Sequence, residues 1–362
     1  MMTVRVLVVD DSAVIRRMLS KALATAPGIE VVGTAPDPFV ARDKLVRLKP
    51  DVMTLDIEMP RMDGISFLRR VMAFSPMPVL ILSSLTPAGS DLALEALQAG
   101  ALEVISKPNA AYSLGEVTAD LIEKVRAAAG ARVDHLVKKA KSQVTTVKAP
   151  LAMTATTNQI VAIGASTGGT RALEEILPLL PPTAPGTLVV QHMPEGFTRS
   201  FAERLDSISR VRVKEAETGD RVVPGTVLIA PGNFHMRLRR TGAAYHVVVD
   251  QQERVNRHRP SVDALFHSVA QYGGRNAVGV ILTGMGADGA EGLLAMRNAG
   301  ARTIGQDEAS CIVYGMPQAA ARLGGVEHVV SLSDVARAIV EQAERGPGAG
   351  TAAPGAKERA SA

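Results

Sequence analysis

The sequence predicts an α/β protein with two domains in series, each built on a mostly parallel β-sheet. The chain has 362 residues, and at roughly 150 residues per domain this length suits two domains with separate cores. Short apolar runs alternate with helical patterns in both halves, an order typical of parallel βαβ units. A polar stretch rich in Lys and Thr, residues 137–157, separates the halves and has the composition of a linker.

The first half is expected to contain five strands joined by helices. The predicted strands are Val4–Val9, Ile29–Val32, Val52–Leu55, Val79–Leu82 and Val104–Ile105. Ser12 is placed to cap the helix after the first strand, Pro38 to Lys49 is amphipathic, and Leu114 to Leu136 has a helical pattern. Because ligands of parallel sheets bind beyond the carboxyl ends of the strands, residues at those ends are candidates for a site.

The second half is expected to form a doubly wound α/β unit that starts at Gln159. Its predicted strands are Ile160–Ile163, Thr187–Val190, Val227–Ile229, Ala277–Leu282 and Ala301–Ile304. A β-excursion is expected between Val211 and Val249, where two Pro-Gly pairs mark turns. Ser333-Asp334 is expected to cap the last helix, and the Ala-, Gly- and Pro-rich residues 346–362 are expected to be disordered.

Composition excludes several classes of function. Aromatic residues make up 3% of the chain and Trp is absent, so a base-stacking surface for single-stranded nucleic acid is not expected. The net charge of +4 is small, and the basic residues are mostly scattered. A single cysteine, Cys311, excludes an internal disulfide and suits a reducing compartment. With no signal peptide or membrane-spanning apolar run in the sequence, we expect a cytoplasmic protein.

Acidic residues gather at the predicted strand ends of the first half. Asp10 and Asp11 follow the first strand, Asp56 the third, and Lys107 the fifth. Neighbouring carboxylates repel one another unless a divalent cation lies among them, and oxygen ligands with room for water suit Mg²⁺. The lysine and the hydroxyl of Ser83, at the end of the fourth strand, are suited to stabilise an added phosphoryl group. Each residue alone is most often a turn or cap, but the whole set predicts a phosphorylation site.

Four stretches of this half resemble the receiver domain of two-component response regulators. They are Leu7 to Ser12, Leu55 to Pro60, Met62 to Gly64 and Ser106 to Pro108, and the resemblance covers residues 3–125. It implies a flavodoxin-like fold with a five-stranded parallel sheet. It also implies that a histidine kinase phosphorylates Asp56.

The same resemblance implies roles for the other polar residues. Mg²⁺ would be held by Asp11, Asp56 and the carbonyl of Glu58, with Asp10 acting through water. Lys107 would pair with the phosphoryl group, and Ser83 would be the switch hydroxyl. Val104 departs from the family pattern, because many receivers carry an aromatic residue three positions before this lysine.

A serine follows the first predicted strand of the second half. The segment Ile160 to Gly169 combines an apolar run, a Gly-Ala-Ser turn and two further glycines before a helical pattern begins. A strand, a tight turn and a helix present such a serine hydroxyl at the carboxyl edge of a sheet, next to backbone N–H groups that bind an anion. Ser166 is therefore a candidate nucleophile.

A nucleophilic serine needs a general base and a carboxylate that orients it. The histidines are His135, His192, His235, His246, His258, His267 and His328. A histidine is most often a surface or core residue without a catalytic role. His192, however, directly follows an apolar strand and is expected at the same sheet edge as Ser166, which makes it the candidate base. Asp288 lies in a glycine-rich loop after a further strand, although helix capping is an alternative role for it.

Five stretches of the second half resemble the catalytic domain of the CheB family of chemotaxis protein-glutamate methylesterases. They are Ile163–Gly169, Gln191–Pro194, Arg259–Asp263, Leu282–Gly289 and Glu308–Pro317, and the resemblance covers residues 158–345. It implies a triad of Ser166, His192 and Asp288, with oxyanion donors at the backbone N–H groups of Thr167 and Met285. The domains would then be 3–125 and 158–345, joined by a helix extension and linker at 126–157.

The resemblance also implies a substrate and partners. The substrate would be glutamate methyl esters on chemoreceptors, with methanol released, and receptor glutamines would be deamidated at the same site. A chemotaxis histidine kinase would be the phosphodonor, with no nucleic acid, no membrane insertion and a monomeric state. We expect the unphosphorylated receiver to cover the Ser166 edge, and phosphorylation to weaken that packing.

Three other classes of protein remain as alternatives. The glycine loop of a nucleotide-binding oxidoreductase is disfavoured because Gly-x-Gly-x-x-Gly and a ribose-binding acid are absent. A DNA-binding regulator is disfavoured because the second half lacks a compact helix-turn-helix pattern. An adaptor that has kept the triad but lost activity is the third. Cys311 lies in an apolar context without an adjacent cation, which favours packing over a nucleophilic role.

Overall fold

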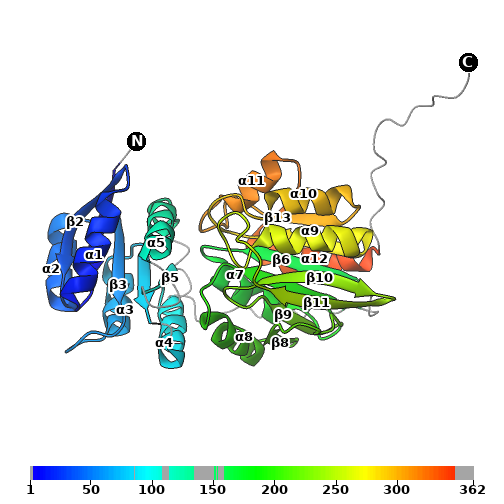
Figure 1. The fold of residues 1–362 in the computed structure, drawn as a ribbon, viewed down its shortest axis with the longest axis horizontal. Helices are drawn as coiled ribbons and strands as arrows, with labels where there is room; N and C mark the ends of the chain where they lie inside the picture. Colours follow the sequence, from blue (N-terminus) through cyan, green and yellow to red (C-terminus); the bar gives the residue numbers. More distant parts are fainter. Residues whose placement is uncertain are drawn as a thin grey trace, which may run out of the picture.

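The computed structural model describes residues 3–84, 86–107, 114–133, 151, 153 and 159–346. Two α/β bodies lie side by side, the first built from the N-terminal part of the chain and the second from the C-terminal part (Figure 1). The predicted linker, apart from Leu151 and Met153, and the predicted disordered tail beyond Gly346 lie outside the described residues.

The first body is a five-stranded parallel sheet, as predicted, and its strand order is β2-β1-β3-β4-β5. Its strands are β1 (Val4–Val9), β2 (Ile29–Ala35), β3 (Val52–Asp56), β4 (Val79–Ser83) and β5 (Glu103–Ser106). Its helices are α1 (Ala13–Ala24), α2 (Pro38–Leu48), α3 (Gly64–Phe74), α4 (Pro87–Gln98) and α5 (Leu114–Ala129). Helix α5 ends at Ala129 rather than at the predicted Leu136, and residues 130–133 are not helical.

Local chemistry explains where these elements begin. Ser12 caps α1 by accepting a hydrogen bond from the backbone N–H of Ile15, as predicted, and Asp63 caps α3 in the same way. The central strands β3 and β4 are buried along their whole length, which accounts for their mostly apolar sequence in a sheet covered on both faces.

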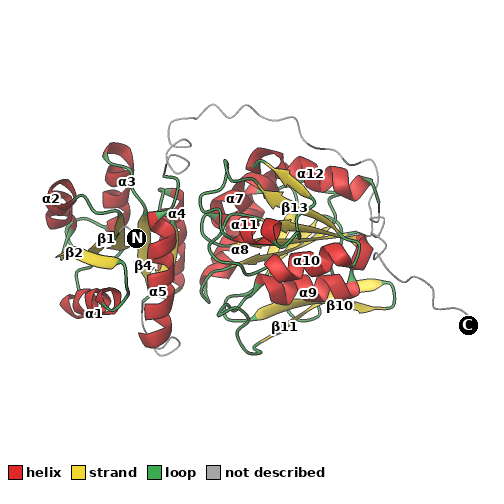
Figure 2. Cartoon of the chain, turned by 90° about the horizontal axis from the view of Figure 1, so that it is seen from above, coloured by secondary structure: helices red, strands yellow, loops and turns green. Residues whose placement is uncertain are grey.

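The second body contains a seven-stranded parallel sheet in the order β14-β13-β12-β6-β7-β9-β8 and an antiparallel hairpin, β10-β11. The strands are β6 (Ile160–Ala165), β7 (Gly186–Gln191), β8 (Arg212–Glu215), β9 (Thr226–Ile229), β10 (His235–Thr241), β11 (Ala244–Asp250), β12 (Ala277–Ile281), β13 (Arg302–Gln306) and β14 (His328–Val330). The helices are α7 (Gly169–Ile176), α8 (Phe197–Ile208), α9 (Val262–Tyr272), α10 (Ala290–Asn298), α11 (Met316–Arg322) and α12 (Leu332–Glu344). Helices cover both faces of this sheet (Figure 2).

Three details differ from the sequence-based expectation. Within the range of the predicted β-excursion, β8 pairs with the predicted strand β9 and joins the edge of the parallel sheet, and β10 and β11 form the hairpin. The short edge strand β14 was not predicted, because its three residues give no periodicity. The last helix starts at Leu332 with Ser331 as its cap residue, so the predicted cap at Ser333-Asp334 lies inside the helix.

The two bodies meet along α4, α5 and β5 of the first and the carboxyl edge of the second sheet. Helix α4 packs against α8 and α7, and α5 lies between the first sheet and the second body (Figures 1 and 2). The backbone N–H of Arg132, just after α5, donates to the carbonyl of Ile312. The first body therefore covers the sheet edge at which the catalytic residues were predicted.

Candidate active site at the boundary between the two domains

Ser166 lies immediately after β6, in the turn that leads into α7. Its backbone N–H donates to the Thr283 carbonyl over 3.0 Å, which ties the turn to the end of β12. Gly168 precedes α7 with φ +81°, a left-handed conformation that side chains other than glycine rarely adopt. An added Cβ at Gly168 would also lie 2.8 Å from Ile312. The glycine thus permits the sharp strand-to-helix turn predicted for a nucleophile.

The two predicted oxyanion donors flank Ser166. Thr167 follows it directly, and Met285 lies in the loop between β12 and α10; all three residues line one cavity. Among the described residues, the backbone N–H groups of Thr167 and Met285 have no hydrogen-bond acceptor. Both groups are therefore available to an oxyanion bound in this cavity.

His192 and Asp288 form a buried pair. His192 follows β7, and its Nε2 lies 2.8 Å from Oδ2 of Asp288. Because Asp288 occupies Nε2, Nδ1 is the ring nitrogen left to accept a proton, and it has no hydrogen-bond partner among the described residues. Burial opposes the charged form of Asp288, but the hydrogen bond and charge interaction with His192 outweigh it and hold the pKa of Asp288 well below its usual range.

Asp288 is also the centre of a wider hydrogen-bond network. Its Oδ1 accepts from Asn256 Nδ2 and from Ser261 Oγ, each over 2.8 Å, and its Oδ2 accepts from the backbone N–H of Val262 over 2.6 Å. Asp288 does not cap α10, the alternative role predicted for it, since Gly289 is the cap residue of that helix. The backbone N–H groups from which Asp288 accepts are those of Val262 and Asp263 at the start of α9. The network fixes the carboxylate that orients His192.

A second histidine stacks on the first. The rings of His258 and His192 lie 3.9 Å apart with an interplanar angle of 13°. Burial lowers the pKa of His258 to about 3, so its imidazole is neutral at neutral pH. The stacked ring restricts rotation of His192 without placing a second charge beside it.

The acidic residues of the first body also come together. Asp10, Asp11 and Asp56 each offer a carboxylate oxygen within 4.8 Å of the others. Lys107 Nζ lies 2.7 Å from Oδ2 of Asp56 and 3.3 Å from Oδ2 of Asp10. Burial raises the pKa of Asp56 to about 6, although Lys107 opposes this effect.

One lysine does not compensate for three clustered carboxylates. Lys107 is the shared ion-pair partner of the buried Oδ2 atoms of Asp10 and Asp56, and the three clustered carboxylates suit a hard divalent cation. Glu58 follows Asp56 closely, and its backbone N–H donates to Asp56 Oδ1 over 3.3 Å. The hydroxyl of Ser83, a buried residue at the end of β4, donates to the carbonyl of Gly89 over 3.0 Å.

Family models match both parts of the chain. The model described as response regulator receiver domain matches residues 6–119, and the model described as CheB methylesterase matches residues 161–339. A protein-glutamate methylesterase/protein-glutamine glutaminase of Anaeromyxobacter dehalogenans is 60% identical over 342 residues, 94% of this chain and 95% of that protein. The chain belongs to the CheB methylesterase family.

Further relatives agree with this assignment. The protein of the same description from Salmonella typhimurium is 51% identical and covers 96% of this chain and 99% of its own length. The crystal structure of the Thermotoga maritima CheB methylesterase catalytic domain is 41% identical, with a TM-score of 0.50, and covers 51% of this chain and 98% of that domain. In the described residues, no helix combines the length and apolarity that crossing a membrane requires.

In this CheB family member the receiver reaches the residue next to the candidate nucleophile. Thr167 Oγ1 donates to Glu103 Oε2 of β5 over 2.6 Å, and both residues are buried. Lys124 of α5 lies 3.4 Å from Oε1 of the same glutamate. The expected covering of the Ser166 edge by the receiver is thus present in the structure.

Sequence reasoning missed the residues that support the triad. Asn256 and His258 lie in an irregular loop without periodicity, and Glu103 and Glu123 approach the site from the other domain. Ser261 lay within one of the motifs that carry the family resemblance, which was its only signal. Cys311 is buried and burial raises its pKa to about 12, in agreement with the predicted packing role.

Proposed function

We propose that the protein is a phosphorylation-activated serine hydrolase that removes methyl groups from glutamate methyl esters of chemoreceptors. The pairing of His192 with Asp288 beside Ser166, in a cavity bounded by the receiver, carries this proposal. Membership of the family supports it, since relatives at 51–60% identity are named protein-glutamate methylesterase/protein-glutamine glutaminase. The same site deamidates receptor glutamines, with ammonia as the leaving group in place of methanol.

The catalytic residues act in two steps. Ser166 Oγ attacks the ester carbonyl while Nδ1 of His192 takes its proton, and His192 then gives this proton to the methoxide oxygen as the C–O bond breaks and methanol leaves. Water, deprotonated by the same nitrogen, attacks the acyl-serine; His192 returns the proton to Ser166 Oγ as that oxygen leaves, and the glutamate is released. Asp288 holds the imidazole in one tautomer and stabilises its charged form, and the N–H groups of Thr167 and Met285 hold the oxyanion.

Activation occurs in the receiver. The carboxylate of Asp56 accepts a phosphoryl group from a chemotaxis histidine kinase, Lys107 pairs with the added charge, and Ser83 serves as the switch hydroxyl. Mg²⁺ held by Asp11, Asp56 and the Glu58 carbonyl, with Asp10 through water, would neutralise charge during this transfer. We place this chemistry in the cytoplasm, with the protein acting as a monomer.

Methanol release from a methylated chemoreceptor tests the esterase. The native chain, supplied with a small phosphodonor and Mg²⁺, is expected to release methanol. Ser166→Ala is expected to lose on the order of 10³-fold or more in rate. Ser207→Ala, an exposed serine of α8, is the matched control and should behave as the native chain. Absence of release by the native chain would contradict the proposal.

A further inference from the structure

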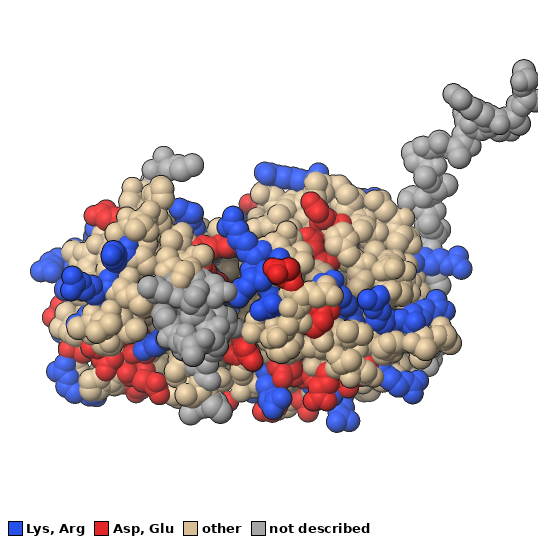
Figure 3. Space-filling model, viewed as in Figure 1, with Lys and Arg blue, Asp and Glu red and all other residues tan. Residues whose placement is uncertain are grey.

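Helix α5 of the receiver and the catalytic serine line the same cavity. Its volume is about 380 Å³, and its walls include Asp120, Glu123 and Lys124 of α5 together with Ser166 and His192. Figure 3 shows basic and acidic side chains meeting at a hollow between the two domains. The cavity is large enough for a side chain that carries an ester.

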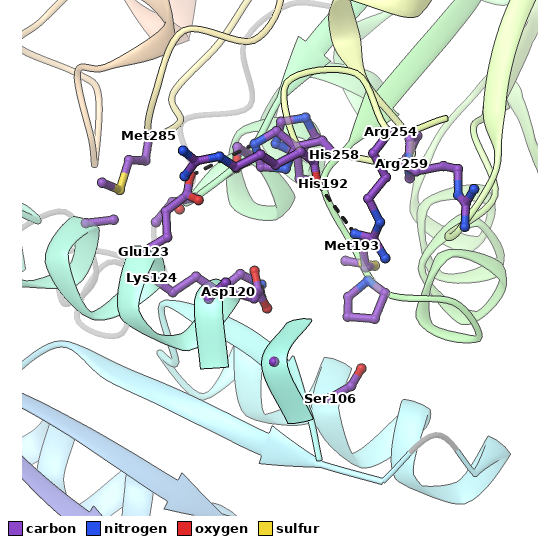
Figure 4. Close-up of a pocket in the computed structure, with 18 residues that line it drawn as sticks. Ser106, Asp120, Glu123, Lys124, His192, Met193, Arg254, His258, Arg259 and Met285 are labelled. Atoms are coloured by element: carbon purple, nitrogen blue, oxygen red, sulfur yellow. Dashed lines mark hydrogen bonds and ion pairs between the residues drawn. The ribbon is translucent and has the colours of Figure 1, made fainter. Parts of the chain in front are cut away.

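The acidic residues of α5 have different partners. Asp120 lies 3.4 Å from Lys124 Nζ, and this lysine also contacts Glu103, so the charge of Asp120 is compensated within the receiver. Glu123 instead points away from its own domain, toward His258 and His192 (Figure 4). Its Oε1 lies 4.0 Å from Nε2 of His258. Burial raises the pKa of Glu123, with Asp120 adding to this effect and the charges of His192 and Arg257 opposing it.

A basic loop, residues 254–259, lines the same cavity as Glu123. Arg254 and Arg257 are exposed and line the cavity with His258. Arg259 holds the loop in place by donating to Asn233 Oδ1 and to the carbonyls of Gln251 and Gln252. The loop is therefore a fixed cationic surface beside the serine.

We propose that α5 occupies the place of the substrate helix: Glu123 imitates the glutamate product, and the basic loop is the surface on which an acidic chemoreceptor helix docks. This inference rests on the proposed function, in which both substrate and product are glutamate side chains on a protein helix. Glu123 is such a side chain on such a helix, and it faces the stacked rings of His258 and His192. The receiver then inhibits in two ways: it covers the site, and its Glu123 competes with the substrate's glutamates for the positive charge of Arg257.

Arg257 is the residue that discriminates mimicry from coverage. If the receiver helix and the substrate helix use the same cation, removing its charge weakens both interactions. If the receiver merely covers the serine, removing the charge of Arg257 changes neither the packing of the receiver nor the binding of the substrate helix. Glu123→Gln removes the charge on the other side and keeps the volume of the side chain.

Peptide binding tests the docking surface without relying on esterase activity. The full chain carrying Ser166→Ala is titrated with two synthetic helical peptides, one with glutamates and one with glutamines at the same positions. With phosphodonor and Mg²⁺ present, we expect the acidic peptide to bind about fivefold more tightly or better, and Arg257→Gln to abolish the difference. Arg212→Gln, an exposed arginine on the edge strand β8, is the matched control. Equal binding of both peptides, or no effect of Arg257→Gln, would overturn the docking surface.

The competition is tested in the same way without phosphodonor. Glu123→Gln is expected to increase binding of the acidic peptide about fivefold, because the competing charge is gone. Glu30→Gln, an exposed glutamate on the far edge strand β2, is the control. Unchanged binding in Glu123→Gln would overturn the mimicry. Binding that behaves as expected while the native chain releases no methanol would contradict the esterase function alone.

Discussion

Asp288 is the acceptor shared by His192, the proposed general base, and by the residues packed around it. It accepts from His192, Asn256, Ser261 and the backbone of Val262, and His192 keeps its pKa low. Asn in its place has one oxygen fewer to accept these bonds and does not stabilise an imidazolium.

Asp288→Asn is therefore expected to lower the rate of methanol release by on the order of 10³–10⁴ with little change in KM. It is also expected to cost about 1–3 kcal/mol of unfolding free energy, because buried donors lose their acceptor. Methanol release and urea unfolding measure the two effects. Asp43→Asn, an exposed aspartate of α2, is the control, and a rate within tenfold of native for Asp288→Asn would contradict the assigned role.

His258 makes stability depend on pH. Burial lowers its pKa from the ordinary 6.5 to about 3. Between these two pH values, His258 binds a proton in the unfolded chain but not in the folded chain. The stabilisation is fully present above pH 6.5 and is lost as the pH falls toward 3.

His258→Phe keeps a ring against His192 and removes the titrating group. Urea unfolding at pH 7.5 and pH 5 should show a smaller loss of stability on acidification in this variant than in the native chain. Comparing the two proteins cancels the contribution of groups they share. An equal loss in both would contradict a neutral, buried His258.

The candidate triad positions stand out in the sequence because each lies just beyond a strand or in a glycine-rich loop after one. Such positions are visible in a linear pattern, since an apolar run ends and a polar residue follows. His258 and Glu123 are not visible in this way: one sits in an irregular loop, and the other is an ordinary position on an amphipathic helix. Only the packing of the two domains brings Glu123 near His258.

Strand β6 depends on a close approach by helix α9. A Cβ added to Gly164 would lie 2.2 Å from Cγ1 of Val262, the first residue of that helix. Val262 also donates to Asp288, so the contact between these elements places the triad carboxylate. Glycine is needed here for space.

Gly164→Ala is accordingly expected to lower the unfolding free energy by about 1–3 kcal/mol and to reduce activity, because α9 must move. Gly130→Ala is the control, since a Cβ there meets its nearest atom at 3.8 Å. Thermal or urea unfolding provides the comparison. If Gly164→Ala and Gly130→Ala have the same unfolding free energy, α9 can move away from β6 without loss of stability, which would contradict the prediction.

Elements with strong periodicity were predicted more accurately than elements defined by their neighbours. The strands β3, β4, β6 and β7 are buried along their whole length, β1 is buried from Val6 onward, and all five were predicted within one or two residues of their bounds. The edge strands β8 and β14 are short, and pairing with β9 and β13 defines them. The start of α12 was misplaced because Ser331, Ser333 and Asp334 are all plausible caps, and Ser331 Oγ contacts both others.

The packing of the two domains connects the phosphorylation site of the receiver with the candidate active site of the second domain. Asp56 and Lys107 lie at the carboxyl edge of the first sheet. In the same domain, Glu103 of β5 accepts a hydrogen bond from Thr167, and Glu123 of α5 faces His258. The contacts at the domain boundary thus include the buried hydrogen bond between Thr167 and Glu103, and Glu123 close to His258. Phosphorylation has to shift the equilibrium between closed and open arrangements by only a few kcal/mol to expose the serine.

The most direct measurement compares methanol release by the native chain and by Asp56→Asn, each with and without a small phosphodonor and Mg²⁺. The native chain is predicted to become faster with the phosphodonor, and Asp56→Asn to stay at its basal rate under both conditions. A native rate that does not respond, or an equal response in Asp56→Asn, would contradict control of the serine site by the receiver.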